Sequence, residues 1–320
     1  MSDDLAQPVA VVPPSGLTDA LTSAAGYALN EKADATRRAY RSDIRLFYAW
    51  CESVGRETVP AEAATVAAYC AHCADSGSSA STIKRRLATI AYAHRLGGFD
   101  APTSAESVKS VFRGIRRRLG THADAKAPAT AKIVAAMVKH MSSDLSGKRD
   151  KALILLGFAA ALRRSELVAL DLDAIHRTDR GMIVHIGKSK TDQEGAGADI
   201  AVPRGRKLRA IEALDDWICS AGLREGAIFR AIGKGGRLLP GRLTDASVAL
   251  IVKKWAKRAN LDPTLFSGHS LRAGFVTSAL EGGADILKVM DVTRHREVKT
   301  LKVYDRRAKA FKDHAGEGFL

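Results

Sequence analysis

The residues best suited to chemistry stand near the C-terminus of this 320-residue chain. Residues 294–306 read RHREVKTLKVYDR, which places Tyr304 nine positions after His295 in a stretch rich in Arg and Lys. A tyrosine near a surface usually packs its ring and hydrogen-bonds its hydroxyl. A phenol among cations can instead act as a nucleophile, because positive charge stabilises the phenolate. The segment alone leaves both roles open.

Three earlier segments carry groups that suit chemistry on a phosphodiester. Cleavage of this bond needs a nucleophile, positive charge for the non-bridging oxygens and a proton for the leaving oxygen. A guanidinium suits the second task, since its planar fork binds two phosphate oxygens and stays charged at any working pH. The segments are ALRRSEL (161–167), GKSKT (187–191) and GHSLRAG (268–274).

The charge of the chain indicates a polyanionic partner. Fifty Lys and Arg against 35 Asp and Glu give a formal net charge of +15 and a pI near 9.8, which makes nucleic acid the first candidate. The cations gather in RRAYRSDIR (37–45), KRR (84–86) and RGIRRR (113–118), so basic faces are expected rather than an even scatter. We expect phosphate contacts from Arg37, Arg38, Arg41, Lys84, Arg85 and Arg86.

The first third of the chain has the pattern of a helical bundle. Apolar residues recur at helical spacing over 36–51, Ser81 or Thr82 can cap a second helix, and a third covers 108–119. THADAKAPAT (121–130) has the composition of an interdomain linker. The predicted organisation is a disordered arm at 1–30, a helical DNA-binding domain at 31–120, this linker, and a second domain at 131–320.

The second domain is predicted to be mostly helical with a small sheet. Helices are expected at 131–142, 148–162 and 164–170, and two β-type runs, MIVHI and ADIAVP, flank a polar, glycine-rich connection. The predicted fold class is therefore mainly α, with an all-helical bundle followed by a mixed α+β domain. Lys188 and Lys190 fall in the connection between the two strands.

Membrane insertion and metal binding are not expected. The longest apolar run, ALILLGFAAAL (152–162), is about half the length that spans a bilayer, and the N-terminus lacks the pattern of a signal peptide. A cytoplasmic protein is expected. Cys70 and Cys73 form a lone CxxC in an alanine-rich helical stretch, where buried cysteines are a more common explanation than a zinc site.

Each motif is weak alone, but their combination resembles the tyrosine recombinase (phage integrase) family. The order L-R-x-x-E-L, a hairpin lysine, H-x-x-R and H-(x)8-Y, following a basic helical domain, is similar to that family over most of the chain, and within it to the Cre type. The family often has Gly-His where this chain has Arg294-His295. The resemblance implies catalytic roles for Arg163, Lys190, His269, Arg272, His295 and Tyr304.

The implied roles are specific. Tyr304 is the nucleophile, Arg163 and Arg272 hold the scissile phosphate, and His269 aids proton transfer. Lys190 is the implied acid toward the leaving 5′ oxygen, with Lys188 as the alternative. Lys188 is otherwise expected to contact DNA, and His295 is a further donor to the phosphate.

Two neighbours of Arg163 each have two candidate roles. Glu166 either orients a neighbouring basic residue or forms an ordinary surface ion pair. The family pattern leaves two residues between the arginine and the glutamate, which selects Arg163. Arg164 is then expected to have a structural role or to contact the DNA backbone.

The resemblance also implies an activity and partners. The implied activity is site-specific recombination through a 3′-phosphotyrosyl link and a Holliday junction, without metal, ATP or another cofactor. The implied assembly is a homotetramer on two double-stranded DNA sites with inverted repeats. The two domains would form a C-shaped clamp on DNA, and the C-terminal tail would dock on a neighbouring protomer. The alternatives are a non-catalytic architectural DNA-binding protein and a type IB topoisomerase that relaxes DNA.

Overall fold

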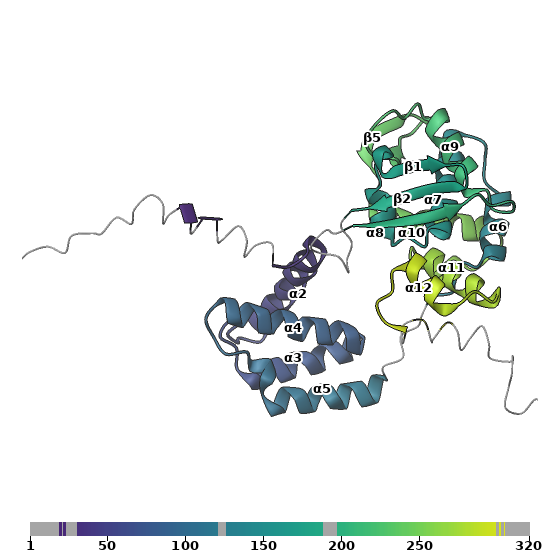
Figure 1. Ribbon diagram of the computed structural model, residues 1–320. Helices are drawn as coiled ribbons and strands as arrows, with labels where there is room; N and C mark the ends of the chain where they lie inside the picture. The colour runs from purple at the N-terminus through teal and green to yellow at the C-terminus, as the bar shows by residue number, and fades with distance from the viewer. Residues whose placement is uncertain are drawn as a thin grey trace, which may run out of the picture. The chain divides into compact units, whose positions relative to one another are not determined.

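The computed structural model describes residues 19–20, 22–23, 31–120, 126–187, 197–298, 301 and 304. The chain divides into two compact units, residues 1–123 and 124–320, and each is described by itself (Figure 1). The described residues are mostly helical with two small antiparallel sheets, so the predicted mainly α class is confirmed. Lys188, Lys190, the arm up to residue 18 and the tail beyond Tyr304 lie outside the described residues.

The first unit is a helical bundle with its own apolar core. The core side chains of this unit come from every one of its four labelled helices, and the buried thiols of Cys70 and Cys73 are among them. Ser79 caps the third of these helices by accepting from the backbone N–H of Thr82, so the expected cap at Ser81 or Thr82 was wrong by two or three positions. The helices are α2 (Asp34–Ser53), α3 (Ala63–Asp75), α4 (Ala80–Leu96) and α5 (Glu106–Leu119).

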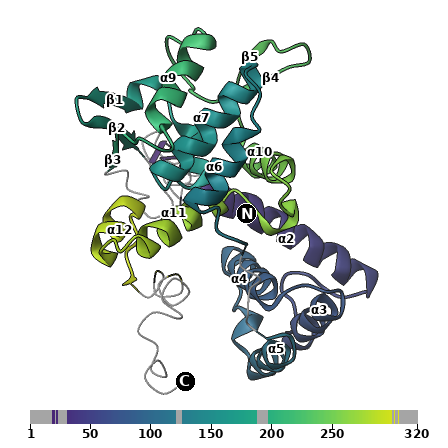
Figure 2. The ribbon, with the colours of Figure 1, turned by 90° about the vertical axis from the view of Figure 1, so that its right-hand side faces the viewer.

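The second unit combines helices with a three-stranded sheet that lies at one side of them (Figures 1 and 2). Its helices are α6 (Ala131–Lys139), α7 (Leu145–Ala159), α8 (Arg164–Ala169), α9 (Ala210–Ser220), α10 (Asp245–Arg258), α11 (Ser270–Glu281) and α12 (Ile286–Thr293). Its strands are β1 (Ile175–Thr178), β2 (Gly181–Ile186), β3 (Ala198–Pro203), β4 (Arg230–Ile232) and β5 (Leu238–Arg242).

The predicted hairpin is present as β2 and β3. The two strands pair antiparallel from Gly181 opposite Pro203 to Ile186 opposite Ala198. The connection that contains the two candidate lysines therefore leaves and re-enters the sheet at paired positions. Strand β1 adds an edge to this sheet, and β4 and β5 form a separate ribbon, which the sequence pattern did not predict.

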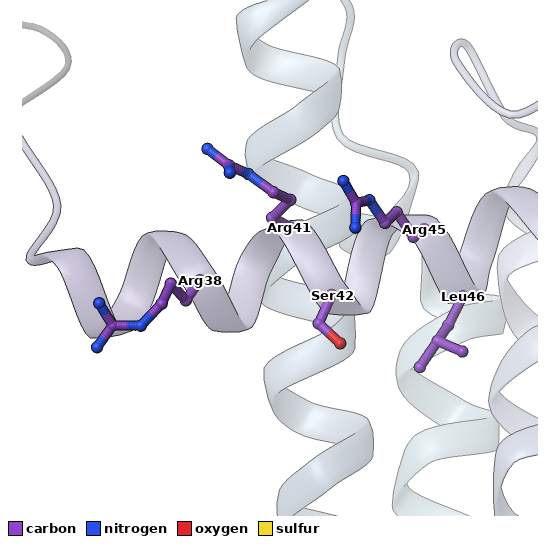
Figure 3. A pocket seen from close by; sticks show the side chains of 5 residues that line it. All are labelled: Arg38, Arg41, Ser42, Arg45 and Leu46. Atoms are coloured by element: carbon purple, nitrogen blue, oxygen red, sulfur yellow. The ribbon is translucent and has the colours of Figure 1, made fainter. Parts of the chain in front are cut away.

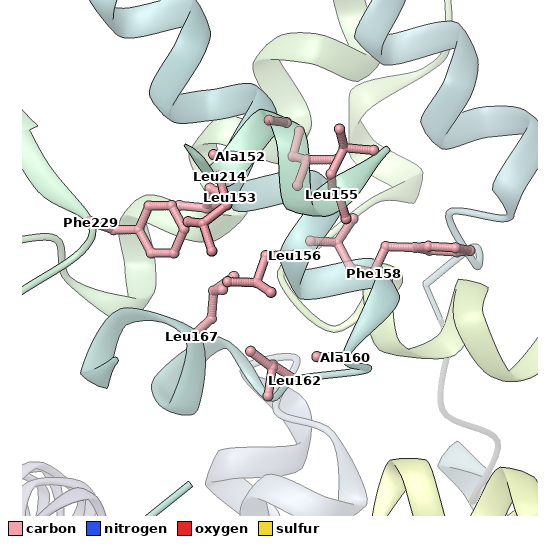
Figure 4. Close-up of a cluster of buried hydrophobic side chains, with 14 of the residues drawn as sticks. Ala152, Leu153, Leu155, Leu156, Phe158, Ala160, Leu162, Leu167, Leu214 and Phe229 are labelled. Atoms are coloured by element: carbon pink, nitrogen blue, oxygen red, sulfur yellow. The ribbon is translucent and has the colours of Figure 1, made fainter. Parts of the chain in front are cut away.

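Helix α7 forms the centre of the second unit. Every residue from Ala152 to Phe158 on this helix is buried, and α9 and α11 both pack against it (Figure 4). Gly157 lets α8 and α11 approach closely, because a Cβ there would lie 2.9 Å from Leu167 and 3.1 Å from Leu271. The two helices that follow Arg163 and His269 are thus both held against α7.

None of the described helices is both long and apolar enough to cross a membrane.

Candidate active site

Arg272 is the most deeply buried charged group of the candidate site. It lies in the first turn of α11, and the residue is 1% exposed. Its guanidinium donates to the carbonyl oxygens of Ala161, at 2.7 Å, and of Thr293. Ala161 has φ of +48°, and this left-handed turn between α7 and α8 presents its carbonyl to the arginine. The backbone on both sides of the site therefore fixes this guanidinium.

Helix α11 is itself fixed by the first residue of α6 and the segment before it. The backbone N–H of Ala129 donates to the carbonyl of Ser270 at 2.8 Å, and that of Ala131 donates to Ser278 Oγ at 2.8 Å. Gly274 makes this approach possible, because a Cβ at that position would lie 1.8 Å from the carbonyl oxygen of Ala129. The glycine of GHSLRAG thus has a packing role beside Arg272.

Arg163 and Glu166 form a closed arrangement at the start of α8. The Arg163 backbone N–H donates to Glu166 Oε2 at 2.8 Å, and its NH1 donates to Oε1 at 2.7 Å. The Glu166 side chain is 2% exposed, so the expectation of an ordinary surface ion pair was wrong. Burial raises the pKa of Glu166, but hydrogen bonds from Arg163 and Arg294 outweigh this effect and hold the pKa below its ordinary value.

Arg294 joins this carboxylate from α12. Its NH2 donates to Glu166 Oε2 at 2.7 Å, and its side chain is 14% exposed. The sequence motifs did not indicate Arg294 as a site residue. The departure from the family's Gly-His pattern at this position was the available signal.

His295 follows immediately and lies between a hydroxyl and a guanidinium. Its Nδ1 is 2.6 Å from Thr293 Oγ1, and its Nε2 is 3.5 Å from Arg272 NH2. Burial and the positive charges of Arg272 and Arg163 lower the pKa of His295 to about 4. The imidazole is therefore neutral at neutral pH.

His269 precedes the first residue of α11 at an exposed edge of the site. Its backbone N–H donates to Ser267 Oγ at 3.2 Å. Desolvation by surrounding protein atoms and the charges of Arg272 and Arg163 lower its pKa, even though part of the side chain reaches solvent. A neutral imidazole is the form that can accept a proton.

Tyr304 packs on a small core beside these groups. This core contains Val276 and Leu280 of α11, Val289 of α12, and Leu301. The partly buried Tyr304 is also close enough to Arg272 for a negative charge on its oxygen to raise the arginine's pKa. The structure thus brings the tyrosine of the C-terminal segment to the buried arginine of α11.

The electrostatics of this cluster favour an anion. Burial and the nearby charge of Arg163 lower the pKa of Arg272 to about 10. The Arg272 guanidinium therefore remains charged at neutral pH, although Arg163 repels it. Arg163 and Arg294 both bind one buried carboxylate, Glu166, whose charge also acts on Arg272, and the excess charge of the cluster is positive. A phosphate placed here would relieve the repulsion between the guanidinium groups.

Arg164 lies at the rim of this cluster. Its side chain is half-exposed and pairs with Asp245 of α10 at 3.1 Å. It also packs along Gly268, where a Cβ would lie 3.2 Å from the arginine's Cδ. These contacts fit the structural role that was one of its two expected roles, and a contact with the DNA backbone stays a prediction.

The cations of the first unit gather elsewhere, along α2. Arg38, Arg41 and Arg45 line a shallow pocket on the surface of this helix, and Ser42 and Leu46 complete its lining (Figure 3). All five residues are exposed. Arg45 and Ser42 thus extend the basic face that was predicted from Arg38 and Arg41. Arg37 is partly buried on the same helix.

The cations of the predicted basic cluster at the start of α4 differ in their partners. Lys84 and Arg85 are both exposed, but Arg85 donates to both oxygens of the buried Asp43, at 2.7 and 3.0 Å. The Arg86 side chain is 18% exposed and donates to Cys73 Sγ at 3.0 Å and to Ser78 Oγ at 3.3 Å. Two of the three cations therefore hold α4 to its neighbours, and their contact with DNA stays a prediction.

Comparison with known proteins agrees with these motifs. The profile of the phage integrase family matches residues 129–310, and that of the phage integrase N-terminal SAM-like domain matches residues 27–96. An integrase/recombinase xerD homolog of Selenomonas ruminantium is 39% identical over 290 residues, which cover 89% of this chain and 85% of that protein. The recombinase cre of Escherichia phage P1 is 26% identical over 285 residues, covering 83% and 82%. The Cre type is therefore the more distant of these two relatives.

Solved structures show the same fold. A lambda integrase dimer bound to a COC′ core site matches with a TM-score of 0.61 at 16% identity, over 91% of this chain and 94% of that one. The Tn1549 transposon integrase in complex with transposon right end DNA matches with a TM-score of 0.57 at 14% identity, over 87% and 93%. Since one family profile covers more than half of the sequence and the xerD homolog aligns over most of it, this chain belongs to the phage integrase family of tyrosine recombinases.

Proposed function

We propose that this member of the family cleaves and rejoins DNA at specific sites with Tyr304 as the nucleophile. The phenol oxygen attacks a phosphorus atom, the bond to the 5′ oxygen breaks, and a 3′-phosphotyrosyl link forms. A 5′ hydroxyl from a partner duplex then attacks this link, expels the tyrosine and joins the new strands. Because the ester energy is kept in the link, the exchange needs no ATP.

The convergence of guanidinium groups beside Tyr304 carries this proposal. Arg272 is buried, charged and fixed by two carbonyl groups, and Arg163 is held by Glu166. Guanidinium groups in this state offer directed N–H donors to the oxygens on which charge develops in the transition state, without reorganisation at the moment of reaction. The role of Arg163 and Arg272 is to bind the scissile phosphate.

Proton transfers are assigned to the neighbouring groups. Neutral His269 accepts the phenol proton, consistent with its lowered pKa. Lys190 protonates the leaving 5′ oxygen. A phosphate contact by His295 requires that its ring give up one of the two partners at Thr293 and Arg272.

Double-stranded DNA is the proposed substrate and partner. The exposed arginines of α2 supply phosphate contacts, and the solved relatives include XerH bound to its difH substrate, with a TM-score of 0.53. Two strand exchanges through a four-way junction, four protomers on two inverted-repeat sites, and closure of the two domains as a clamp complete the proposal.

The decisive experiment compares wild type with Tyr304→Phe. The Tyr304→Phe protein is first used to select the fragments of a genomic library that it binds. Each selected duplex is then given a nick near each candidate cleavage point. Cleavage beside the nick releases a short strand that diffuses away and cannot rejoin. Wild type should then accumulate a covalent protein–DNA adduct that survives denaturation. Tyr304→Phe should bind the same duplex without forming the adduct, and an adduct formed by this variant would refute the assignment.

The same preparation separates the alternatives. An architectural protein would bind without any adduct. A type IB topoisomerase would relax supercoiled plasmid without paired sites and would not exchange strands between two labelled duplexes, whereas a recombinase would produce joined products from them.

A further inference from the structure

Arg294 makes a buried ion pair that the reaction proposed above does not use. It ends α12 in the left-handed region, with φ of +55°, and its NH2 donates to Glu166. Its Nε and NH1 are buried and have no acceptor within the described part of the chain. Glycine enters this backbone region without steric penalty, whereas a residue with a Cβ is uncommon there. An arginine at this position suggests that its side chain is needed.

The two oxygens of Glu166 are divided between two arginines. Oε1 accepts from Arg163 NH1, and Oε2 accepts from the Arg163 backbone and from Arg294 NH2. A carboxylate and one guanidinium commonly form two parallel hydrogen bonds. Arg294 occupies the oxygen that would complete such a fork. Glu166 therefore holds the Arg163 side chain through a single nitrogen.

This division leaves donors on Arg163 for the substrate. Among the described residues, none accepts a hydrogen bond from Nε or NH2 of Arg163. We infer that Arg294 is a positioning residue, which shares Glu166 with Arg163 and so keeps the remaining N–H groups of Arg163 available to the phosphate. This inference rests on the proposed function, in which Arg163 binds the scissile phosphate.

The same ion pair ties the C-terminal segment to α8. Arg294 adjoins His295 and stands ten residues before Tyr304, while Glu166 lies on α8, three residues after Arg163. Loss of the pair therefore frees the end of α12 from α8 and permits Glu166 to form a fork with Arg163. Both changes misplace groups that act on the phosphate, and neither removes a DNA-binding surface.

A purely structural role makes the opposite prediction for one substitution. If Arg294 only ended α12, Arg294→Gly would be tolerated, because glycine suits the left-handed conformation. The positioning role predicts a folded Arg294→Gly that cleaves slowly. Arg209 provides a matched control, because it is also a left-handed arginine, with φ of +40°, and its weak pair with Glu212 is exposed.

The experiment measures single-turnover cleavage of the selected nicked duplex at saturating protein. Arg294→Gly and Arg294→Gln should bind this duplex within about threefold of wild type but cleave it at least about tenfold more slowly, a loss of about 1.4 kcal/mol in transition-state stabilisation. Arg294→Lys should recover part of the rate, since its ammonium can still occupy Oε2. Arg209→Gly should cleave at the wild-type rate. Thermal unfolding of each variant confirms that it is folded, and Arg294→Gln carries the test if the glycine variant is not.

A double variant tests the route through the carboxylate. In a Glu166→Gln background, Arg294→Gly should cause little further loss, because the shared acceptor has already changed. The inference would be overturned if Arg294→Gly and Arg294→Gln cleaved at the wild-type rate, or if the losses in the double variant were fully additive. Neither result would affect the proposed function. Absence of any Tyr304-dependent adduct with wild type would refute the proposed function, and this inference with it.

Discussion

Arg272 NH2 lies 3.5 Å from His295 Nε2, and since a guanidinium can only donate, the imidazole nitrogen is the acceptor. The proton of the neutral ring then belongs on Nδ1, 2.6 Å from Thr293 Oγ1. Thr293 in turn donates to the carbonyl of Val289 at 2.7 Å. This chain of donors and acceptors is complete only while His295 is neutral. Protonation would place an N–H against the Arg272 guanidinium.

The first prediction concerns stability against pH. A histidine whose folded-state pKa is about 4 and whose unfolded value is near 6.5 binds its proton more tightly in the unfolded chain. The free energy of unfolding should therefore fall as the pH falls from 6.5 toward 4. By pH 5 the loss from His295 should be on the order of 1 kcal/mol. Carboxylates whose pKa is lowered by folding, such as Glu166, add a loss of the same sign at the acid end of this range, so the comparison is made above pH 5.

Urea unfolding at several pH values measures this slope. His295→Asn keeps a donor toward Thr293 but cannot be protonated, so it should flatten the slope between pH 5 and 6.5. His269, whose pKa is also lowered, supplies a remaining slope of the same sign. An equal slope in wild type and His295→Asn would show that Arg272 and Thr293 do not hold the ring as described.

The fold could be predicted wherever local periodicity agreed with burial. The hairpin of β2 and β3 was predictable, because its two β-type runs flank a polar connection. Strands β1, β4 and β5 are short, and most of their residues are exposed or only partly buried, so they carry no comparable apolar signal. Their pairing depends on contacts that the local sequence does not encode.

The site likewise has residues that the sequence identified and residues that it did not. Arg163, His269, Arg272 and Tyr304 were identifiable from motif order, and the structure brings them together. Arg294 was not identified, because its importance comes from a carboxylate 128 positions earlier in the chain. The intrachain partners of the basic run at 84–86 were not predictable for a related reason, since Asp43 and Cys73 bind Arg85 and Arg86 from other helices.

The second prediction is that Arg272→Lys loses both stability and cleavage. The guanidinium donates from two different nitrogens to two carbonyl oxygens, and the single ammonium of a lysine cannot reproduce this geometry. A buried carbonyl left unsatisfied costs about 1–3 kcal/mol of folding free energy. Cleavage should be measured well below the unfolding temperature, so that misfolding does not account for the loss. Cleavage within a few-fold of wild type would contradict a two-arginine grip on the phosphate.

The third prediction uses two helical glycines with opposite surroundings. Gly274→Ala drives a Cβ into the Ala129 carbonyl, which should destabilise the second unit by about 3 kcal/mol as the backbone shifts. Gly114→Ala in α5 meets no atom within 4 Å and should stabilise its helix by about 0.5–1 kcal/mol. Thermal unfolding of both variants checks the signs. Two shifts of the same sign would contradict the close approach at Gly274.

The fourth prediction separates the cations at the start of α4. Lys84→Gln should lower the slope of log affinity against log salt by about one, because an exposed ammonium is available to a phosphate. Arg86→Gln should instead reduce stability, since it breaks the bonds to Cys73 and Ser78. DNA binding titrated at four salt concentrations gives the slopes. An unchanged slope in Lys84→Gln would make Lys84 an ordinary solvated surface residue.

The last prediction concerns the proton for the leaving 5′ oxygen. Among the described groups of the site, His269 and His295 have lowered pKa values and are mostly neutral at neutral pH, while guanidinium groups are weak acids. A lysine ammonium is a more suitable acid, and the connection between β2 and β3 carries two lysines.

Sulfur in place of the bridging 5′ oxygen identifies which lysine is used, because a thiolate leaves without receiving a proton. Lys190→Ala should cleave ordinary DNA slowly, by about 10²-fold or more, and should recover most of its rate on 5′-bridging phosphorothioate DNA. Lys188→Ala is the matched control from the same connection and should show no such selective recovery. Recovery by Lys188→Ala without recovery by Lys190→Ala would transfer the role to Lys188, and recovery by neither would mean that the acid lies outside this connection.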